Sequence, residues 1–251
     1  MRVANEGGPF AMIPDPIRRE ATAARAPLDA DGAWVEVLRP ARSQVPRPAL
    51  FLDRDGTIIE EVGFISRAED VRLIAGAADV IAAANRNGVA VVIVTNQSGI
   101  ARSLFAWEDF AAVQARMLTE LADAGAFIDA VLACPHHRDG RAPYNHPDHP
   151  DRKPNPGLVH RAAGLLPIAL AQSWLIGDRG SDIIAAARAG LAGGLLVATG
   201  VGAQPSEREA ALQQRSSGRF EVILGGSIAT ALARLPLFGG DTLGNVTPPA
   251  V

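Results

Sequence analysis

Short apolar runs alternate along the chain with segments that place small apolar residues at helical spacing. The run 49–52 is apolar throughout and ends at Asp53, as is typical of a strand buried on both faces. A helix is predicted over 77–87, and after Gly88 the largely β-branched run 89–94 predicts the next strand. By the same pattern we predict further strands at 130–134, 173–176, 195–198 and 221–224, and further helices at 107–124, 156–165 and 182–189.

The alternation of strands with helices indicates the fold class. About six strands fall within the usual size of one sheet. Because strands joined by right-handed helical crossovers pair in parallel, we predict an α/β fold with a doubly wound, Rossmann-like parallel sheet. The first 47 residues are rich in Ala, Arg and Pro, and their one strand-like stretch is 34–38. We predict an extension over 1–47, one domain over 48–235 and a tail over 236–251.

Charge and composition narrow the classes of partner and compartment. The 24 Lys and Arg against 27 Asp and Glu give a net charge of −3, so nucleic acid and acidic membrane surfaces are not expected partners. The single Cys134 excludes an intrachain disulfide and favours the cytoplasm. Neither a secretory signal nor a run of about 20 apolar residues is present, so no membrane span is predicted. The pattern does not fix the oligomeric state, and a monomer is our working expectation.

Polar side chains that suit chemistry follow the predicted strands at their carboxyl ends. In open α/β sheets, ligands bind beyond those ends. We therefore expect one crevice to be formed by these residues: Asp53, Asp55, Thr95, Asn96 and Asp178.

The pair Asp53 and Asp55 suggests a magnesium-dependent phosphoryl transfer. Two carboxylates this close repel each other unless a hard divalent cation joins them, and Asp178 can supply a third carboxylate ligand to Mg²⁺. Asp53 would attack phosphorus, and Asp55 would act as the general acid and base. Lys153, Thr95 and the backbone near Asn96 would stabilise the phosphoryl oxygens. Alone, an Asp-x-Asp pair is more often a solvated turn, and only the companion motifs favour catalysis.

Other classes of phosphate-binding protein lack support in the sequence. No Gly-x-x-x-x-Gly-Lys-Ser/Thr loop is present, and acids follow the first strand of the domain where a dinucleotide-binding protein has a Gly-rich turn. A phospho-acceptor or phosphate-binding regulatory module stays open as an alternative, because such modules also phosphorylate an aspartate at a strand end. Asp55 favours an enzyme, since a built-in acid and base promotes turnover.

Four motifs in order carry a resemblance to a known family. They are Asp-Arg-Asp-Gly-Thr at 53–57, Val-Thr-Asn-Gln-Ser-Gly at 94–99, Arg-Lys-Pro at 152–154 and Gly-Asp-Arg-Gly-Ser-Asp at 177–182. Together they resemble the haloacid dehalogenase (HAD) superfamily of phosphotransferases. Within it, segments 95–102 and 134–137 are similar to the D-glycero-D-manno-heptose-1,7-bisphosphate 7-phosphatases, which remove the 7-phosphate of that sugar. Histidinol-phosphate phosphatase, built on the same framework, is the alternative activity.

The resemblance implies roles for individual residues around a small phosphorylated metabolite. Catalysis would involve Asp53, Asp55, Thr95 and Lys153, and Mg²⁺ would be bound by Asp53, Asp178 and the backbone carbonyl of Asp55. The intervals between the motifs leave no room for a large cap domain. Substrate contacts would come from these residues: Glu61, Val62, Gly63, Phe64, Thr95, Asn96, Gln97, Ser98, Arg152, Lys153 and Arg179.

A structural zinc ion is the second metal that the resemblance implies. In the related phosphatases a Cys-x-His pair and a Cys-x-Cys pair bind zinc and fasten the loop that covers the site. This chain keeps Cys134 and His136, but His149 and Asp151 stand where the second pair is expected. These four residue types can bind zinc tetrahedrally. The alternative is that zinc has been lost and the histidines belong to a loop beside a buried cysteine.

Overall fold

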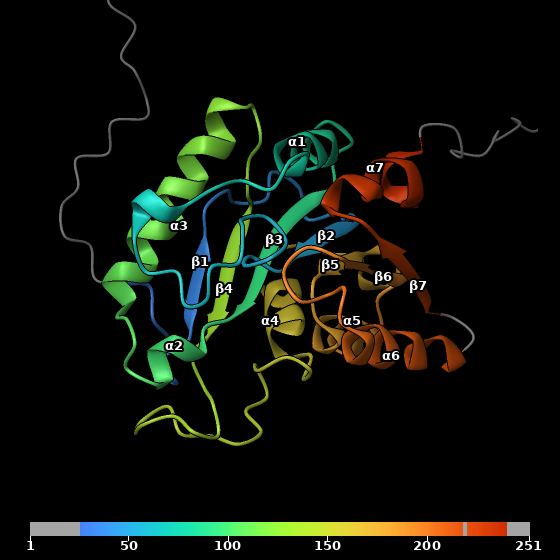
Figure 1. Cartoon of the computed structure of the whole chain (residues 1–251). Coiled ribbons are helices and arrows are strands. Elements are labelled where there is room, and N and C mark those ends of the chain that lie inside the picture. The colour runs from blue at the N-terminus through green and yellow to red at the C-terminus, as the bar shows by residue number, and fades with distance from the viewer. Residues whose placement is uncertain (1–25, 218–219, 240–251) are drawn as a thin grey trace, which may run out of the picture.

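A seven-stranded sheet crosses the part of the chain that the computed structural model describes, residues 26–217 and 220–239. Its strand order is β1-β4-β3-β2-β5-β6-β7, and every neighbouring pair is parallel except β1 with β4 (Figure 1). The strands are β1 (Trp34–Val37), β2 (Ala49–Leu52), β3 (Ala90–Asn96), β4 (Ala130–Cys134), β5 (Trp174–Gly177), β6 (Gly193–Val197) and β7 (Glu221–Gly225).

Helices cover both faces of the sheet. One layer contains α1 (Ala77–Arg86), α3 (Trp107–Asp123) and α7 (Ala231–Arg234), and the other α4 (Gly157–Leu165), α5 (Gly180–Arg188) and α6 (Pro205–Leu212). The one-turn helix α2 (Ser98–Ala101) follows β3 directly. Short 3₁₀ helices lie at Ala68–Asp70, Leu170–Gln172, Gln213–Ser217, Ile228–Thr230 and Pro236–Phe238.

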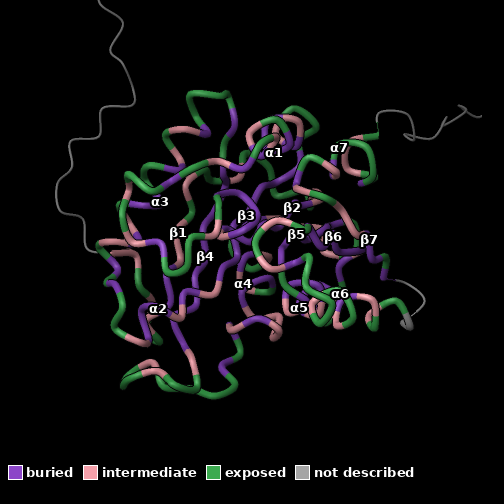
Figure 2. The backbone as a smooth tube through the Cα atoms, viewed as in Figure 1, coloured by how far each residue is buried: buried purple, intermediate pink, exposed green. Residues whose placement is uncertain are grey.

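The central strand β2 separates two hydrophobic cores. Leu50 and Leu52 pack into the core beneath α1 and α3, whereas Phe51 packs into the core beneath α4 and α5. All four residues of β2 are fully buried, as Figure 2 shows for the middle of the sheet. Side chains alternate between the faces of a strand, so an entirely apolar run is what a doubly covered strand requires. The first polar side chain after it, Asp53, therefore lies at the carboxyl edge of the sheet.

The predicted fold class is confirmed, and the predicted elements lie within a few residues of the observed ones. The sheet contains one strand more than predicted, because Trp34–Val37 pairs antiparallel with β4 at an edge. Part of the predicted extension thus contributes to the sheet, although the boundary at residue 48 stays a prediction. Residues 1–25 and most of the predicted tail, 240–251, lie outside the described residues.

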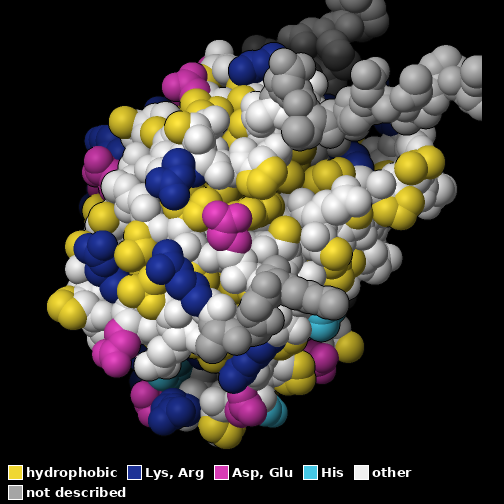
Figure 3. Space-filling model, turned by 90° about the vertical axis from the view of Figure 1, so that its right-hand side faces the viewer, with side chains coloured by type: hydrophobic (Ala, Val, Ile, Leu, Met, Phe, Trp, Pro, Cys, Tyr) yellow, Lys and Arg dark blue, Asp and Glu magenta, His cyan; other side chains and the backbone are white. Residues whose placement is uncertain are grey.

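Surface charge and helix length are two further features of the described part of the molecule. On the face turned to the viewer in Figure 3, Lys and Arg side chains lie among Asp and Glu, and neither sign forms a continuous field. None of the helices within the described ranges is both long and apolar enough to cross a bilayer.

Candidate active site

A cavity of about 770 Å³ opens at the carboxyl ends of the central strands. Ligand sites in proteins commonly enclose roughly 300 to 1,000 Å³. The exposed Val62 does not line this cavity, and the fully buried Asp178 lies behind its wall, close to Asp53. The remaining predicted catalytic and substrate residues all line it: Asp53, Asp55, Glu61, Gly63, Phe64, Thr95, Asn96, Gln97, Ser98, Arg152, Lys153 and Arg179.

Lys153 joins two carboxylates at the base of the cavity. Its Nζ lies 2.8 Å from Oδ1 of Asp53 and 2.6 Å from Oδ1 of Asp182, and it donates to the carbonyl of Val94 at 2.7 Å. The Asn96 side chain fixes the Lys153 backbone through two hydrogen bonds, one to its N–H and one to its carbonyl. The ammonium group is thereby held beside Asp53 with little freedom to move.

Burial and mutual repulsion perturb the charges of this group. Burial, with repulsion from Asp182 and Asp55, raises the pKa of Asp53 to about 6 despite the attraction of Lys153. Burial, and then repulsion from Asp53 and Asp182, raises the pKa of Asp178 to about 7. Burial alone would lower the pKa of Lys153, but Asp182 and Asp53 outweigh it and raise that pKa. Ionised Asp53 and Asp178 therefore repel each other and Asp182 in a buried place, and a bound cation would offset this repulsion.

Asp55 is held by two neighbours that sequence reasoning treated differently. The guanidinium of the fully buried Arg54 donates from Nε to Oδ1 at 2.9 Å and from Nη2 to Oδ2 at 3.1 Å. Gln97, predicted as a substrate contact, donates to Asp55 Oδ2 at 2.8 Å and to the Thr95 hydroxyl at 3.0 Å. Arg54 was missed because the middle residue of an Asp-x-Asp pair is expected to point away from both acids. The two hydrogen bonds from Arg54 hold the Asp55 carboxyl in a fixed orientation.

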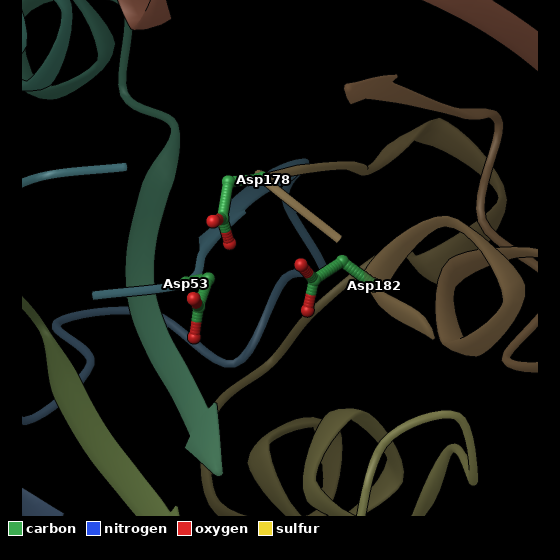
Figure 4. A group of neighbouring side chains, drawn as sticks. All are labelled: Asp53, Asp178 and Asp182. Carbon is green, nitrogen blue, oxygen red and sulfur yellow. The ribbon is translucent and has the colours of Figure 1, made fainter. Parts of the chain in front are cut away.

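The acidic residues beside Lys153 fit a divalent cation. Ligand atoms of Asp53, Asp178 and Asp182 lie within 4.8 Å of one another, and Figure 4 shows the three carboxylates facing a common space. Oδ1 of Asp178 is buried and has no hydrogen-bond partner among the described residues, whereas Oδ2 accepts from Val201 N–H at 2.9 Å. Both oxygens of Asp182 are engaged, Oδ1 with Lys153 and Oδ2 with the Arg179 N–H, whereas Asp53 pairs with Lys153 through Oδ1, so Asp53 and Asp178 are the carboxylates better placed to bind Mg²⁺. The carbonyl ligand from Asp55 stays a prediction.

Aromatic and basic side chains form the outer rim of the cavity. The Arg102 guanidinium lies 5.8 Å from the centre of the Phe64 ring and 3.0 Å from Nε2 of His137. Arg152 donates from Nη1 to the His136 carbonyl at 2.9 Å, and burial lowers the pKa of its guanidinium. Burial, followed by repulsion from Asp55, raises the pKa of Glu61. The rim therefore offers cations to a substrate that carries a second anionic group.

The four residues expected to bind zinc lie near one another, but their arrangement in this structure does not fit a tetrahedral zinc site. The imidazole rings of His136 and His149 stack at 3.7 Å with an interplanar angle of 5°. An imidazole nitrogen binds a metal in the plane of its ring, so two stacked parallel rings cannot point at one ion. The Asp151 carboxylate instead pairs with Arg161, so in this arrangement it is not directed at a shared metal position.

Comparisons with known proteins agree with this site. A family model for HAD-hydrolase-like proteins matches residues 151–217. A D-glycero-beta-D-manno-heptose-1,7-bisphosphate 7-phosphatase of Mesorhizobium japonicum is 46% identical over 179 residues, which are 71% of this chain and 82% of the relative. The enzyme of the same name from Escherichia coli K12 is 37% identical over 164 residues, 65% of this chain and 86% of the relative.

A solved structure supports the same family. The crystal structure of the D,D-heptose 1,7-bisphosphate phosphatase of B. bronchiseptica, complexed with magnesium and phosphate, aligns with a TM-score of 0.62 at 31% identity. That alignment covers 75% of this chain and 98% of the other. Since a relative at 46% identity is matched over 82% of its length, the chain belongs to the D-glycero-beta-D-manno-heptose-1,7-bisphosphate 7-phosphatases, phosphoric monoester hydrolases with a HAD-like fold.

Proposed function

We propose that this chain hydrolyses the 7-phosphate of D-glycero-β-D-manno-heptose 1,7-bisphosphate through a phosphoryl group carried transiently on Asp53. The observation that carries the proposal is the buried Asp53 carboxylate, 2.8 Å from the Lys153 ammonium and open to the cavity that Asp55 also lines. The names of the relatives support the substrate. Bound at Asp53 and Asp178, Mg²⁺ would neutralise the oxygens of the transferring phosphate.

In the first step Asp53 attacks phosphorus. A carboxylate oxygen of Asp53 forms the new P–O bond while the bond between phosphorus and O7 of the sugar breaks. The electron pair remains on O7, and the Asp55 carboxyl donates a proton to it, so a neutral hydroxyl leaves. Arg54 and Gln97 hold Asp55 in a fixed orientation for this transfer. The products of the step are the heptose 1-phosphate and an aspartyl phosphate.

In the second step water replaces Asp53. The Asp55 carboxylate accepts a proton from water as the water oxygen bonds to phosphorus and the bond to Asp53 breaks. Inorganic phosphate leaves, and both carboxyl groups return to their starting states. Lys153 and the Thr95 hydroxyl stabilise the charge of the phosphoryl oxygens in both steps, because both lie at the base of the cavity.

Substrate recognition is assigned to the rim. Arg152, Arg179 and Arg102 line the cavity together, and we infer that they bind the 1-phosphate and sugar hydroxyls. The loop 61–64 contributes Phe64 as an apolar wall for the sugar ring. The cytoplasmic location and the monomeric state stay predictions.

The test replaces the nucleophile and screens substrates. We expect Asp53→Asn to lower kcat by at least about three orders of magnitude, because the neutral amide of Asn cannot attack phosphorus to form the covalent intermediate. Phosphate release would be measured with Mg²⁺ on the heptose bisphosphate, histidinol phosphate and nucleotides. Arg116→Met, on the exposed face of α3, is the control.

The outcomes separate the competing activities. A heptose bisphosphate turned over orders of magnitude faster than the others supports the proposal. Preference for histidinol phosphate would establish the alternative enzyme, and parental activity in Asp53→Asn would exclude the covalent mechanism. A stable phosphorylated protein without turnover would instead indicate a regulatory module.

A further inference from the structure

Arg161 links two segments that are far apart in the chain. From α4 its guanidinium donates Nη1 to Oδ2 of Asp151 and Nη2 to Oδ2 of Asp29. Asp29 precedes the edge strand β1, and Asp151 directly precedes Arg152 and Lys153. One side chain therefore ties the segment before β1 to the residues that enter the cavity.

The surroundings of Asp151 favour a fixed position. Its carboxylate side chain is only 7% exposed, against 30% for Arg161 and 22% for Asp29. A Cβ added at Gly157 would lie 2.4 Å from Oδ1 of Asp151, so the start of α4 packs directly against this carboxylate. Paired charges this sheltered from water attract more strongly than an exposed pair. The three groups thus form a packed unit.

Two further contacts join the same segments. His136 Nε2 donates to the Asp31 carbonyl at 3.0 Å, and Arg152 Nη1 donates to the His136 carbonyl at 2.9 Å. The stacked ring of His149 covers His136, and its Nδ1 accepts from the Asp151 N–H at 3.1 Å. Two hydrogen bonds made by His136 therefore connect the segment before β1 to Arg152.

Charge perturbations agree with an ion-paired group. Burial would raise the pKa of Asp29, but hydrogen bonds from Arg161 and from the Ala33 and Asp31 N–H groups outweigh it and lower that pKa. Burial would lower the pKa of Arg161, and the two carboxylates outweigh it as well. Both shifts favour the charged forms that the pairing requires.

We propose that Asp29, Arg161 and Asp151 form a metal-independent clamp, in which Arg161 is a positioning residue that holds Arg152 and Lys153 in the active site. The clamp includes Asp151, one of the four residues expected to bind zinc, and pairs its carboxylate with Arg161. It rests on the proposed function only for the roles of Arg152 and Lys153. Its existence as a structural link is independent of that function.

Metal content is the first test. The full chain, purified without chelator, is expected to contain less than about 0.1 zinc per chain by elemental analysis. Its activity with Mg²⁺ is expected to persist after removal of trace zinc by a zinc-selective chelator. Stoichiometric zinc, or activity that only zinc restores, would contradict the proposal that the clamp is independent of metal.

Variants test the positioning role. Arg161→Met removes the charge at similar length, and Asp29→Asn removes one partner with little change in size. We expect Arg161→Met to lower kcat/KM about tenfold or more, since a displacement near 1 Å can cost about a hundredfold in rate. Because both variants break one unit, Asp29→Asn is expected to add less than about twofold in the Arg161→Met background. Arg116→Met, which breaks an exposed ion pair on α3, is the matched control.

A second readout does not depend on activity. Backbone hydrogen exchange of residues 136–153 is expected to rise in Arg161→Met and to stay at the parental level in Arg116→Met. If Arg161→Met does not fold, Asp29→Asn provides the same comparison. Parental exchange and parental kcat/KM in a folded Arg161→Met variant would contradict the clamp. Raised exchange in a chain that hydrolyses no phosphate ester would retain the clamp and reject the proposed function.

Discussion

The orientation of Asp55 depends on the second residue of the motif at 53–57, to which no role was assigned from the sequence. This residue, Arg54, is fully buried and donates two hydrogen bonds to the Asp55 carboxylate. Its guanidinium lies 4.8 Å from the centre of the Phe110 ring. Arg54→Met should lower kcat/KM on a sugar phosphate by roughly 10- to 100-fold, because general acid catalysis contributes about 10²- to 10⁴-fold and needs a well-placed proton. Steady-state kinetics on a folded variant measure this.

A substrate with a better leaving group distinguishes positioning from general damage. An aryl phosphate needs little protonation of its leaving oxygen, so Arg54→Met should lower its kcat/KM much less than that of the sugar phosphate. Equal losses on both substrates would mean that Arg54 supports the fold of the site rather than the proton transfer.

Some of this residue-level detail was accessible from the sequence and some was not. The convergence of Asp53, Thr95 and Asp178 follows from strand ends that share one edge of a parallel sheet. The direction of the Arg54 side chain depends on how its guanidinium packs against Phe110, and the stacking of His136 on His149 depends on how their loop folds, and spacing encodes neither. The zinc ligand set was inferred from the family resemblance and the residue types at the expected positions, whereas the pairing of Asp151 with Arg161 depends on where α4 lies.

The loop between β6 and α6 approaches the site through a glycine. Gly200 has φ of 58°, and a Cβ there would lie 2.2 Å from Oδ2 of Asp178. Gly200→Ala should therefore destabilise the fold by about 1 to 3 kcal/mol and weaken Mg²⁺ binding, because the buried carboxylate must shift. Denaturant unfolding and Mg²⁺ titration of activity measure the two effects.

Gly190, which lies between α5 and β6, provides the matched control for Gly200→Ala. It has φ of 75°, and no heavy atom of the described residues comes within 4 Å of an added Cβ. Gly190→Ala should cost only the backbone strain and leave the dependence on Mg²⁺ unchanged. If both alanine variants retain the parental Mg²⁺ dependence, contact between Gly200 and Asp178 is unimportant for the metal.

The elements themselves were largely predictable because their signals are strong. The buried parallel strand β2 is an unbroken apolar run, β3 is apolar up to Thr95, and α3 repeats apolar residues at helical spacing over 17 residues. The helix α6 was missed because it is polar and buries only Ala211. The strand β1 was recognised as strand-like but not placed in the sheet, since its pairing with β4 is a long-range contact.

The stability of the molecule should depend jointly on pH and Mg²⁺. The pKa values of Asp53 and Asp178 rise from 3.8 to about 6 and about 7 in the fold, so folding favours their protonated forms. Their contribution to the stability of the metal-free protein is complete below about pH 4 and is lost as the pH rises through 6 to 7. Mg²⁺ at about 100 times its Kd should then raise Tm by roughly 5 to 10 °C at pH 8, and far less at pH 5.5, where it competes with protons.

Thermal unfolding with and without Mg²⁺ at the two pH values tests this linkage. In the Asp178→Asn variant the side chain at this position cannot titrate. The variant should lose most of the rise in Tm that Mg²⁺ causes at pH 8. An equal rise of Tm at pH 5.5 and pH 8 would show that protons and Mg²⁺ do not compete for these carboxylates.

The antiparallel strand β1 has a consequence for where this chain can be shortened. Trp34 contacts the rings of Trp107 and Phe110, and the four residues of β1 pair with β4 along the edge of the sheet. A truncated form starting at Pro48 would leave the β4 backbone unsatisfied and expose these aromatic rings, the combination that promotes edge-to-edge self-association. It would also lack Asp29, so the same cut would loosen the loop that carries Lys153.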